Sequence, residues 1–286
     1  MIVFPNAKIN LGLNIVERRS DGYHNLETLF YPIPLEDVLE VMTFDEAIDT
    51  PHPTDVDYTF QLHGIQVTGI PEDNLVVRAY HLMKEEFDIP PVHIYMYKHI
   101  PSGAGLGGGS ADATFMLRLL RDKFDLPLTD DDLERRSVRL GADCPFFVRN
   151  SPAFATGIGD VFTPMPQVSL SGYTLILVKP DIFVSTRDAF SLVRPHRPHV
   201  AISDLVTLPI SQWREAGLSN DFEESVFAIH PTLFDVKQRL YDLGALYASM
   251  SGSGSSLFGI FYKSPFENEQ KLREAFPDSF CWSVDL

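Results

Sequence analysis

The stretch that decides the fold reads Pro101-Ser102-Gly103-Ala104-Gly105-Leu106-Gly107-Gly108-Gly109-Ser110-Ala111-Asp112-Ala113. It follows an apolar segment at 92–100 and precedes residues with the apolar spacing of a helix, so we expect a strand, a glycine loop and a helix in that order. Glycine lacks a Cβ, so successive backbone N–H groups of such a loop can surround an anion. A helix that begins near Ser110 points free N–H groups and its positive dipole end at the same place. The stretch therefore predicts a site for nucleotide phosphates.

Other interpretations of this loop fit less well. A flexible linker is the plainest alternative, but five glycines lie within seven residues and lead straight into an amphipathic pattern. A Walker A loop needs Gly-Lys-Ser/Thr at the helix start, and this loop has no lysine. The dinucleotide pattern is met formally by Gly103, Gly105 and Gly108, yet the acidic residues about 20 positions later, 130–132, open a helix instead of ending a strand.

The segments before the loop indicate strands. Residues 7–15 alternate between apolar and polar types, which predicts a strand with one buried face. Residues 18–22 contain Asp-Gly and predict a turn, and a second strand is expected through Leu26, Thr28 and Phe30. Residues 45–57 are acidic and proline-rich and predict an exposed loop.

The remaining patterns mix helices and strands without strict alternation, which favours an α+β fold. We expect helices at 76–87, 110–124, 130–140 and 231–243, and strands at 92–100, 173–178, 257–262 and 280–284. Thr129 and Asp132 fit a capping box at the start of the third helix, and Gly141 would end it. Composition shifts near residue 150, so we predict two domains, 1–152 and 153–286.

Composition restricts the class of protein. The 286 residues carry a formal charge of −16, which disfavours nucleic acid and anionic membranes as partners. Two cysteines, Cys144 and Cys281, build neither a disulfide framework nor a zinc site. The first residues lack the pattern of a secretion signal, and no apolar run approaches a membrane span. We expect a cytoplasmic protein with no obligate protein partner.

Two residues are candidates for phosphoryl transfer. Lys8 and Asn10 share one face of the first strand, and Asp143 lies in a turn, Gly141 to Pro145, before an aromatic run. Phosphoryl transfer needs a carboxylate that accepts the hydroxyl proton and a cation that stabilises developing charge. Each residue also has a structural interpretation: a lysine on a solvated strand face, and an aspartate in an Asx turn or at a helix end.

Three motifs together resemble those of the GHMP kinases, the family of galactokinase and of homoserine, mevalonate and phosphomevalonate kinases. These motifs are Asn6 to Leu11, the glycine loop, and Ser251-Gly252-Ser253-Gly254-Ser255-Ser256. Residues 20–29, Ser-Asp-Gly-Tyr-His-Asn-Leu-Glu-Thr-Leu, resemble one branch of that family, whose substrate carries a cytidine diphosphate head group. That branch acts in the non-mevalonate route to isoprenoids. The motifs run in the family's order over nearly the whole chain.

The resemblance implies an N-terminal ATP-binding domain, a smaller C-terminal substrate domain and transfer from ATP with Mg²⁺. Lys8 and Asp143 would be the catalytic pair, and residues Pro101 to Ala111 would wrap the triphosphate. The residues implied for substrate binding are Asn10, Tyr23, His24, Thr186, Phe190, Gly252 and Gly254. Tyr23 would stack on the cytosine, and Thr186 and Phe190 would form the second wall of its pocket. Ala111 departs from the branch, which usually has a second serine there.

Some alternatives remain open from sequence. Another kinase of the same family, acting on mevalonate, homoserine or a sugar, would share the phosphate loop but has no use for a base-stacking Tyr23 followed by His24. A protein of the same fold that binds ligand without turnover would need neither Lys8 nor Asp143. The nine histidines form no metal-binding motif, so we expect no set of protein side chains that binds a structural metal. Ser110, at the helix start, is the candidate for contact with Mg²⁺ or phosphate.

Overall fold

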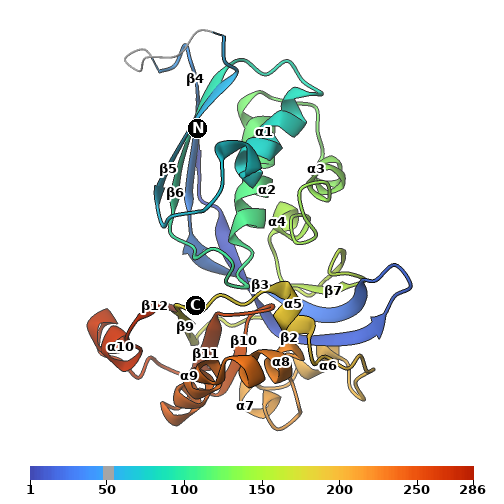
Figure 1. The fold of residues 1–286 in the computed structure, drawn as a ribbon, viewed down its shortest axis with the longest axis vertical. Helices are drawn as coiled ribbons and strands as arrows, with labels where there is room; N and C mark the ends of the chain where they lie inside the picture. Colours follow the sequence, from blue (N-terminus) through green and yellow to red (C-terminus); the bar gives the residue numbers. More distant parts are fainter. Residues whose placement is uncertain (48–54) are drawn as a thin grey trace. The chain divides into compact units, whose positions relative to one another are not determined.

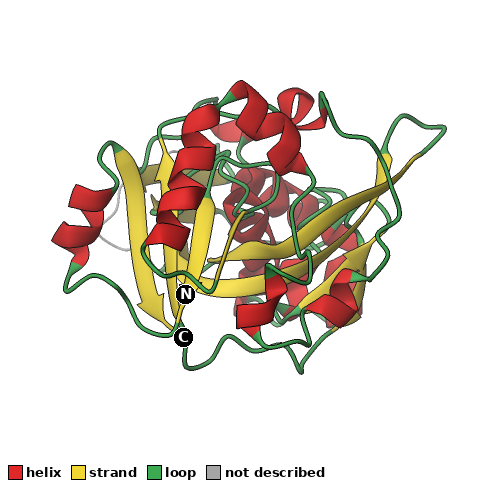
Figure 2. Ribbon diagram, turned by 90° about the horizontal axis from the view of Figure 1, so that it is seen from below, coloured by secondary structure: helices red, strands yellow, loops and turns green. Residues whose placement is uncertain are grey.

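The computed structural model describes residues 1–47 and 55–286, so the middle of the loop predicted at 45–57 lies outside the described residues. The chain forms two compact units, each with helices and strands (Figures 1 and 2). The first unit comprises Met1–Ala7, Ile33–Ser102 and Gly107–Asn150. The second unit comprises Lys8–Pro32, Gly103–Leu106 and Ser151–Leu286. The predicted α+β class is confirmed.

The first unit is built on a sheet of order β1-β4-β6-β5. Its strands are β1 (Ile2–Val3), β4 (Val38–Thr43), β5 (Tyr58–Gly64) and β6 (Val92–Lys98). β1, β4 and β6 pair antiparallel, whereas β5 runs parallel to β6. The helical elements are η1 (Pro71–Asp73), α1 (Leu75–Lys84), α2 (Gly108–Lys123), α3 (Asp130–Ser137) and α4 (Phe146–Arg149). α1 and α2 lie along one face of the sheet (Figure 1).

Local sequence explains where these helices begin and end. Asn74 caps α1 by accepting a hydrogen bond from the Val76 N–H at 2.9 Å. The capping box of Thr129 and Asp132 is present at α3, but this helix ends at Ser137, three residues before the predicted Leu140. α2 begins two residues before the predicted Ser110, so the last glycines of the loop are already helical. Buried side chains of α1 and α2 pack on those of β4 and β6 to form this unit's core.

The second unit contains an antiparallel sheet of order β10-β11-β9-β12. Its strands are β9 (Thr174–Pro180), β10 (Tyr247–Met250), β11 (Leu257–Phe261) and β12 (Ser279–Asp285). The predicted strands at 257–262 and 280–284 are confirmed, and each pairs with β9. A further sheet has the order β2-β3-β7-β8, with strands β2 (Asn6–Arg18), β3 (His24–Glu36), β7 (Ala153–Thr156) and β8 (Val161–Pro164).

Helices complete the second unit. They are α5 (Thr186–Phe190), α6 (Ile202–Leu205), α7 (Ile210–Trp213), α8 (Phe222–Ile229), α9 (Pro231–Asp242) and α10 (Glu269–Ala275). The predicted helix at 231–243 is confirmed as α9, which has proline at its first position, where the missing N–H costs nothing. Side chains from β2, β9, α8 and α9 share one apolar core.

The units do not divide the chain at a single point. β2 and β3 each have one end in the first unit and the other end in the second. From Ser151 to Leu286 the whole chain belongs to the second unit. The domains predicted at 1–152 and 153–286 therefore stay a prediction. Within residues 1–47 and 55–286, no helix is both long and apolar enough to cross a membrane.

Candidate active site

Lys8 and Asn10 lie on β2 with 3 % and 0 % of their surface exposed. The prediction of one buried face is therefore wrong, because segments distant in the sequence also cover the polar face of this strand. The Lys8 N–H donates to the Leu106 carbonyl at 2.9 Å, and the Ser251 hydroxyl reaches Asn10 Oδ1 at 3.4 Å. A buried lysine must be paired, so burial favours a functional lysine over one on a solvated strand face.

A hydrogen-bond network fixes the end of the Lys8 side chain. Lys8 Nζ donates to Asn10 Oδ1 at 2.7 Å and lies 4.6 Å from the centroid of the Phe30 ring. The Asn10 amide nitrogen donates to Thr28 Oγ1 at 2.8 Å, and the Thr28 hydroxyl donates to the Gly12 carbonyl at 2.6 Å. These contacts orient the Lys8 ammonium group toward Asn10 and the Phe30 ring.

The glycine loop uses backbone conformations that glycine adopts readily. Gly103, Gly105 and Gly107 have φ values of 61°, 75° and 69°, in the left-handed region that favours glycine. A Cβ on Gly105 would lie 1.9 Å from the Ser251 carbonyl oxygen, so only glycine fits there. Residues 103–106 belong to the second unit and residues 107–111 to the first.

The third motif lies beside the first part of this loop. Ser251 donates its N–H to the Ser256 carbonyl at 2.9 Å, and the Ser256 N–H donates to the Ala104 carbonyl at 3.2 Å. Gly252 and Gly254 are buried, with φ values of 53° and 91°. The second unit thus brings Lys8, Asn10, residues 103–106 and the Ser251–Ser256 loop together.

The residues implied for the cytidine pocket are partly brought together. The rings of His24 and Phe190 stack with centroids 4.7 Å apart and an angle of 23° between their planes. Tyr23 is 63 % exposed, and Thr186 is exposed at the start of α5. Burial, followed by the nearby charge of Arg18, lowers the pKa of His24 below its ordinary value, so the imidazole is neutral at pH 7. Aromatic surface and a neutral imidazole suit a nucleobase.

Asp143 lies half-buried in a turn of the first unit, at residues 142–145. Thr114 of α2 donates its hydroxyl to the carbonyls of Cys144 at 2.8 Å and Ser110 at 2.9 Å, which ties the turn to α2. Burial raises the pKa of the Cys144 thiol to about 11, so it is not a nucleophile. Asp143 and Lys8 belong to different units, so their pairing stays a prediction.

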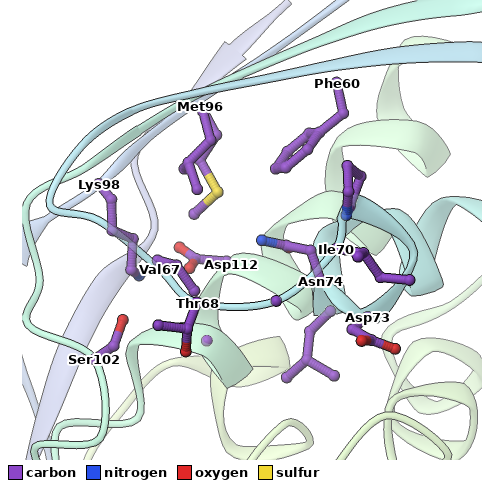
Figure 3. A pocket seen from close by; sticks show the side chains of 15 residues that line it. Phe60, Val67, Thr68, Ile70, Asp73, Asn74, Met96, Lys98, Ser102 and Asp112 are labelled. Atoms are coloured by element: carbon purple, nitrogen blue, oxygen red, sulfur yellow. Dashed lines mark hydrogen bonds and ion pairs between the residues drawn. The ribbon is translucent and has the colours of Figure 1, made fainter.

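A cavity of about 370 Å³ in the first unit was missed by sequence reasoning. Apolar side chains such as Phe60, Met96 and Ile70 line it, with Lys98, Asp112, Ser102 and Asn74 as polar groups (Figure 3). This volume and this mixture of apolar walls with few polar groups are typical of small-ligand sites. The available signal was the position of Lys98, three residues before the glycine loop, and of Asp112, the residue after it.

Lys98 joins two buried aspartates at the edge of this cavity. Its ammonium pairs with Asp37, and with Asp112 Oδ2 at 2.6 Å. Asp37 Oδ1 also accepts the backbone N–H groups of His99 and Ile100 at 2.6 and 2.8 Å. Burial lowers the pKa of Lys98, but the charges of Asp112 and Asp37 outweigh this effect and raise the pKa above its ordinary value. Asp37 and Asp112 thereby hold both ends of the glycine loop within the first unit.

Known proteins resemble the whole chain. The family models for the N-terminal and C-terminal domains of GHMP kinases match residues 74–151 and 209–280. A Bacteroides fragilis protein named 4-diphosphocytidyl-2-C-methyl-D-erythritol kinase is 55 % identical over the full length of both chains. A Parabacteroides distasonis protein of the same name is 50 % identical, also over both full lengths.

Solved structures agree. The crystal structure of a 4-(cytidine 5'-diphospho)-2C-methyl-D-erythritol kinase has a TM-score of 0.77 at 31 % identity, covering 99 % of this chain and 98 % of the other. A homoserine kinase from Cytophaga hutchinsonii has a TM-score of 0.67 at 17 % identity, covering 98 % and 94 %, which shows a shared fold alone. The two-domain architecture expected from the three motifs is confirmed.

Proposed function

The chain belongs to the GHMP kinases, and from its full-length likeness to 4-diphosphocytidyl-2-C-methyl-D-erythritol kinases we propose that it transfers the γ-phosphate of ATP to the 2-hydroxyl of 4-diphosphocytidyl-2-C-methyl-D-erythritol. This reaction serves the non-mevalonate synthesis of isoprenoid precursors. ATP as a substrate and two cysteines without a disulfide fit a cytoplasmic enzyme.

One observation supports the proposal most strongly: the buried network of Lys8, Asn10 and Ser251 lies in the same unit as the stacked rings of His24 and Phe190. The network supplies a fixed cation for phosphoryl transfer. The stacked rings supply an apolar surface for a base. A kinase for mevalonate or homoserine needs the network but has no base to place on the rings.

The roles in the reaction follow from charge and geometry. Asp143 accepts the proton of the substrate hydroxyl as that oxygen attacks the γ-phosphorus. Lys8 stabilises the negative charge that develops, and Asn10 keeps its ammonium group oriented. Backbone N–H groups of the glycine loop, Pro101 to Ala111, and the N-terminus of α2 hold the triphosphate.

ATP has room for its base in the cavity of the first unit. Phe60, Met96 and Ile70 offer apolar surface to the adenine, and the cavity wall includes Ser102 and Gly109 of the glycine loop. The adenine base and the phosphates of ATP would thus both contact the glycine loop. ATP would be held there by local contacts and not by a positively charged protein surface, since the chain has a formal charge of −16.

The residues at the start of α2 fit a magnesium ion. Mg²⁺ takes oxygen ligands, keeps several waters and relies on substrate phosphates more than on protein side chains. A Cβ placed on Gly141 would lie 3.8 Å from Ser110 Oγ, so this hydroxyl is close to the turn that carries Asp143. Ser110 would hold the ion together with phosphate oxygens of ATP. When bound, Mg²⁺ would neutralise negative charge on the phosphates. Across the described residues, no three His, Cys, Asp or Glu side chains gather as a metal site.

The cytidine head group would lie between Tyr23 on one side and Phe190 with Thr186 on the other. His24 is neutral and can hydrogen-bond the base through a ring nitrogen. Gly252 and Gly254 leave room for the backbone to approach the phosphate end of the substrate. Asn10 lies beside this loop and would contact the substrate as well.

A coupled assay of ADP release tests the proposal. The enzyme receives Mg-ATP and either 4-diphosphocytidyl-2-C-methyl-D-erythritol, mevalonate or homoserine at equal concentrations. We expect turnover with the cytidine substrate alone. ADP release with homoserine or mevalonate and none with the cytidine substrate would assign the chain to another kinase of the family. Cytidine-ligand binding without ADP release would indicate a binding protein.

A further inference from the structure

Asn220 belongs to none of the three motifs, yet the nitrogen and the oxygen of its side-chain amide both form hydrogen bonds. It is 2 % exposed and directly precedes the region where α8 begins. Its amide nitrogen donates to the carbonyls of Met250 and Gly252, each at 2.8 Å. Its amide oxygen accepts the Phe222 N–H at 3.0 Å. The side chain therefore joins the start of α8 to the backbone on both sides of Ser251.

The neighbours of Asn220 are fixed to β2, the strand that carries Lys8 and Asn10. The Leu13 N–H donates to the Ser219 carbonyl at 2.9 Å, and the Asp221 N–H donates to the Leu13 carbonyl at 2.8 Å. The Ile15 N–H donates to Asp221 Oδ2 at 2.7 Å. Asn220 thus extends from an anchored segment, and its two donated bonds place the Ser251 backbone relative to β2.

Ser251 has little freedom to move without disturbing the site. Its hydroxyl lies 2.8 Å from the Gly105 carbonyl, to which it donates, and 3.4 Å from Asn10 Oδ1. A Cβ built on Gly252 would lie 3.2 Å from Gly105 Cα, which shows how closely the two loops approach. A shift of the Ser251 backbone would therefore displace Gly105 in the phosphate loop and the Asn10 oxygen that orients Lys8.

We propose that Asn220 is a positioning residue for phosphoryl transfer, which acts through Ser251 to hold Gly105 and Asn10 in their working geometry. The inference rests on the proposed kinase function and goes beyond it, since Asn220 touches neither nucleotide nor substrate in that proposal. All residues concerned belong to the second unit.

The chemistry of asparagine explains why this residue type is needed. An amide offers two donors on one nitrogen and an acceptor on its oxygen, and here all three are used. An ionised aspartate has the same shape but only acceptors, so it would face the Met250 and Gly252 carbonyls without a proton to share. Asn220→Asp thus keeps the shape of the side chain but removes the two hydrogen-bond donors on which the proposal depends.

The test compares Asn220→Asp and Asn220→Ser with a control, Thr174→Val. Thr174 is also buried in the second unit and donates one side-chain bond to Asp285 at 2.5 Å, but it lies on β9, outside the proposed site. Steady-state kinetics with Mg-ATP and the cytidine substrate are measured well below each variant's Tm. We expect kcat to fall about 10- to 100-fold in Asn220→Asp, as for a displacement of about 1 Å at a reacting group. The Kd of cytidine, which lacks the phosphates that Gly252 and Gly254 would meet, should change less than about threefold, because His24 and Phe190 are not in this network. Thr174→Val should keep its kcat.

A double-substitution cycle shows whether Asn220 acts through Ser251. If it does, adding Ser251→Ala to Asn220→Asp should cost little further kcat, because coupled residues are not additive. Multiplicative losses would overturn the proposal, as would a folded Asn220→Asp enzyme with a kcat equal to that of Thr174→Val. If Asn220→Asp does not fold, Asn220→Ser decides by the same criteria. A wild-type enzyme that releases no ADP with the cytidine substrate would refute the proposed function instead.

Discussion

Gly105→Ala is the substitution for which the structure gives the clearest magnitude. Gly105 has a φ of 75°, and an added Cβ would lie 1.9 Å from the Ser251 carbonyl oxygen and 2.8 Å from its carbon. Ordinary contact begins near 3.4 Å, so the glycine loop and the Ser251 backbone must separate by about 1.5 Å. A left-handed backbone costs a non-glycine residue about 1–2 kcal/mol. A displacement of about 1 Å in the reacting geometry can cost about 100-fold in rate.

We therefore expect Gly105→Ala to lower kcat at least tenfold and to lower Tm by roughly 2–8 °C, the shift that such a stability loss gives a domain of this size. The control is Gly217→Ala, because Gly217 has a similar φ of 88° but nothing within 4 Å of its added Cβ. It should show the loss of Tm without the loss of kcat. Coupled ADP release and thermal unfolding measure the two quantities. A Gly105→Ala enzyme with the kcat of Gly217→Ala would refute the close approach of the two loops as a requirement for catalysis.

Three further predictions concern the chemistry and the substrate. Asp143→Asn should lower kcat by about 10²–10⁴ and leave ATP affinity nearly unchanged, the loss expected for a general base; a retained kcat would make Asp143 structural. Tyr23→Ala should weaken binding of the cytidine substrate roughly 5- to 150-fold, because stacking one base on the ring contributes about 1–3 kcal/mol, while Tyr23→Phe should lose much less affinity. Calorimetry measures these affinities, and an equal loss of affinity for an ATP analogue would contradict stacking. Because the pKa of His24 is lowered, the unfolded chain binds more protons as pH falls through 6.5, so stability should decrease there. Thermal unfolding from pH 8 to 5 should show a smaller decrease in His24→Gln, and identical profiles would contradict this assignment.

The sequence was most informative where local chemistry alone decides the backbone. The capping box of Thr129 and Asp132 depends on residues three positions apart and is present as predicted. The alternation at 7–15 likewise predicted β2. It could not predict that Lys8 and Asn10 are buried, because the groups that cover them, Leu106 and Ser251, come from far along the chain.

The cavity of the first unit shows the same limit. Its wall combines residues of β5, β6, η1 and α2, and the parallel pairing of β5 with β6 brings the first two together. Nothing in the local pattern near Phe60 indicates that pairing, so the wall could not be assembled from sequence. Lys98 and Asp112 could have been suspected, because two ionisable residues flank the glycine loop.

The fate of the phosphate tests the central claim most directly. Phosphorus NMR follows a mixture of the enzyme, Mg-ATP and 4-diphosphocytidyl-2-C-methyl-D-erythritol. We predict one new phosphomonoester for each ADP formed and an intact cytidine diphosphate group. The new phosphorus signal should lack three-bond coupling to hydrogen, because the 2-carbon bears no hydrogen, whereas a phosphate on a primary or secondary hydroxyl would show it. Formation of ADP with inorganic phosphate alone, or of a phosphomonoester at another position, would contradict the account.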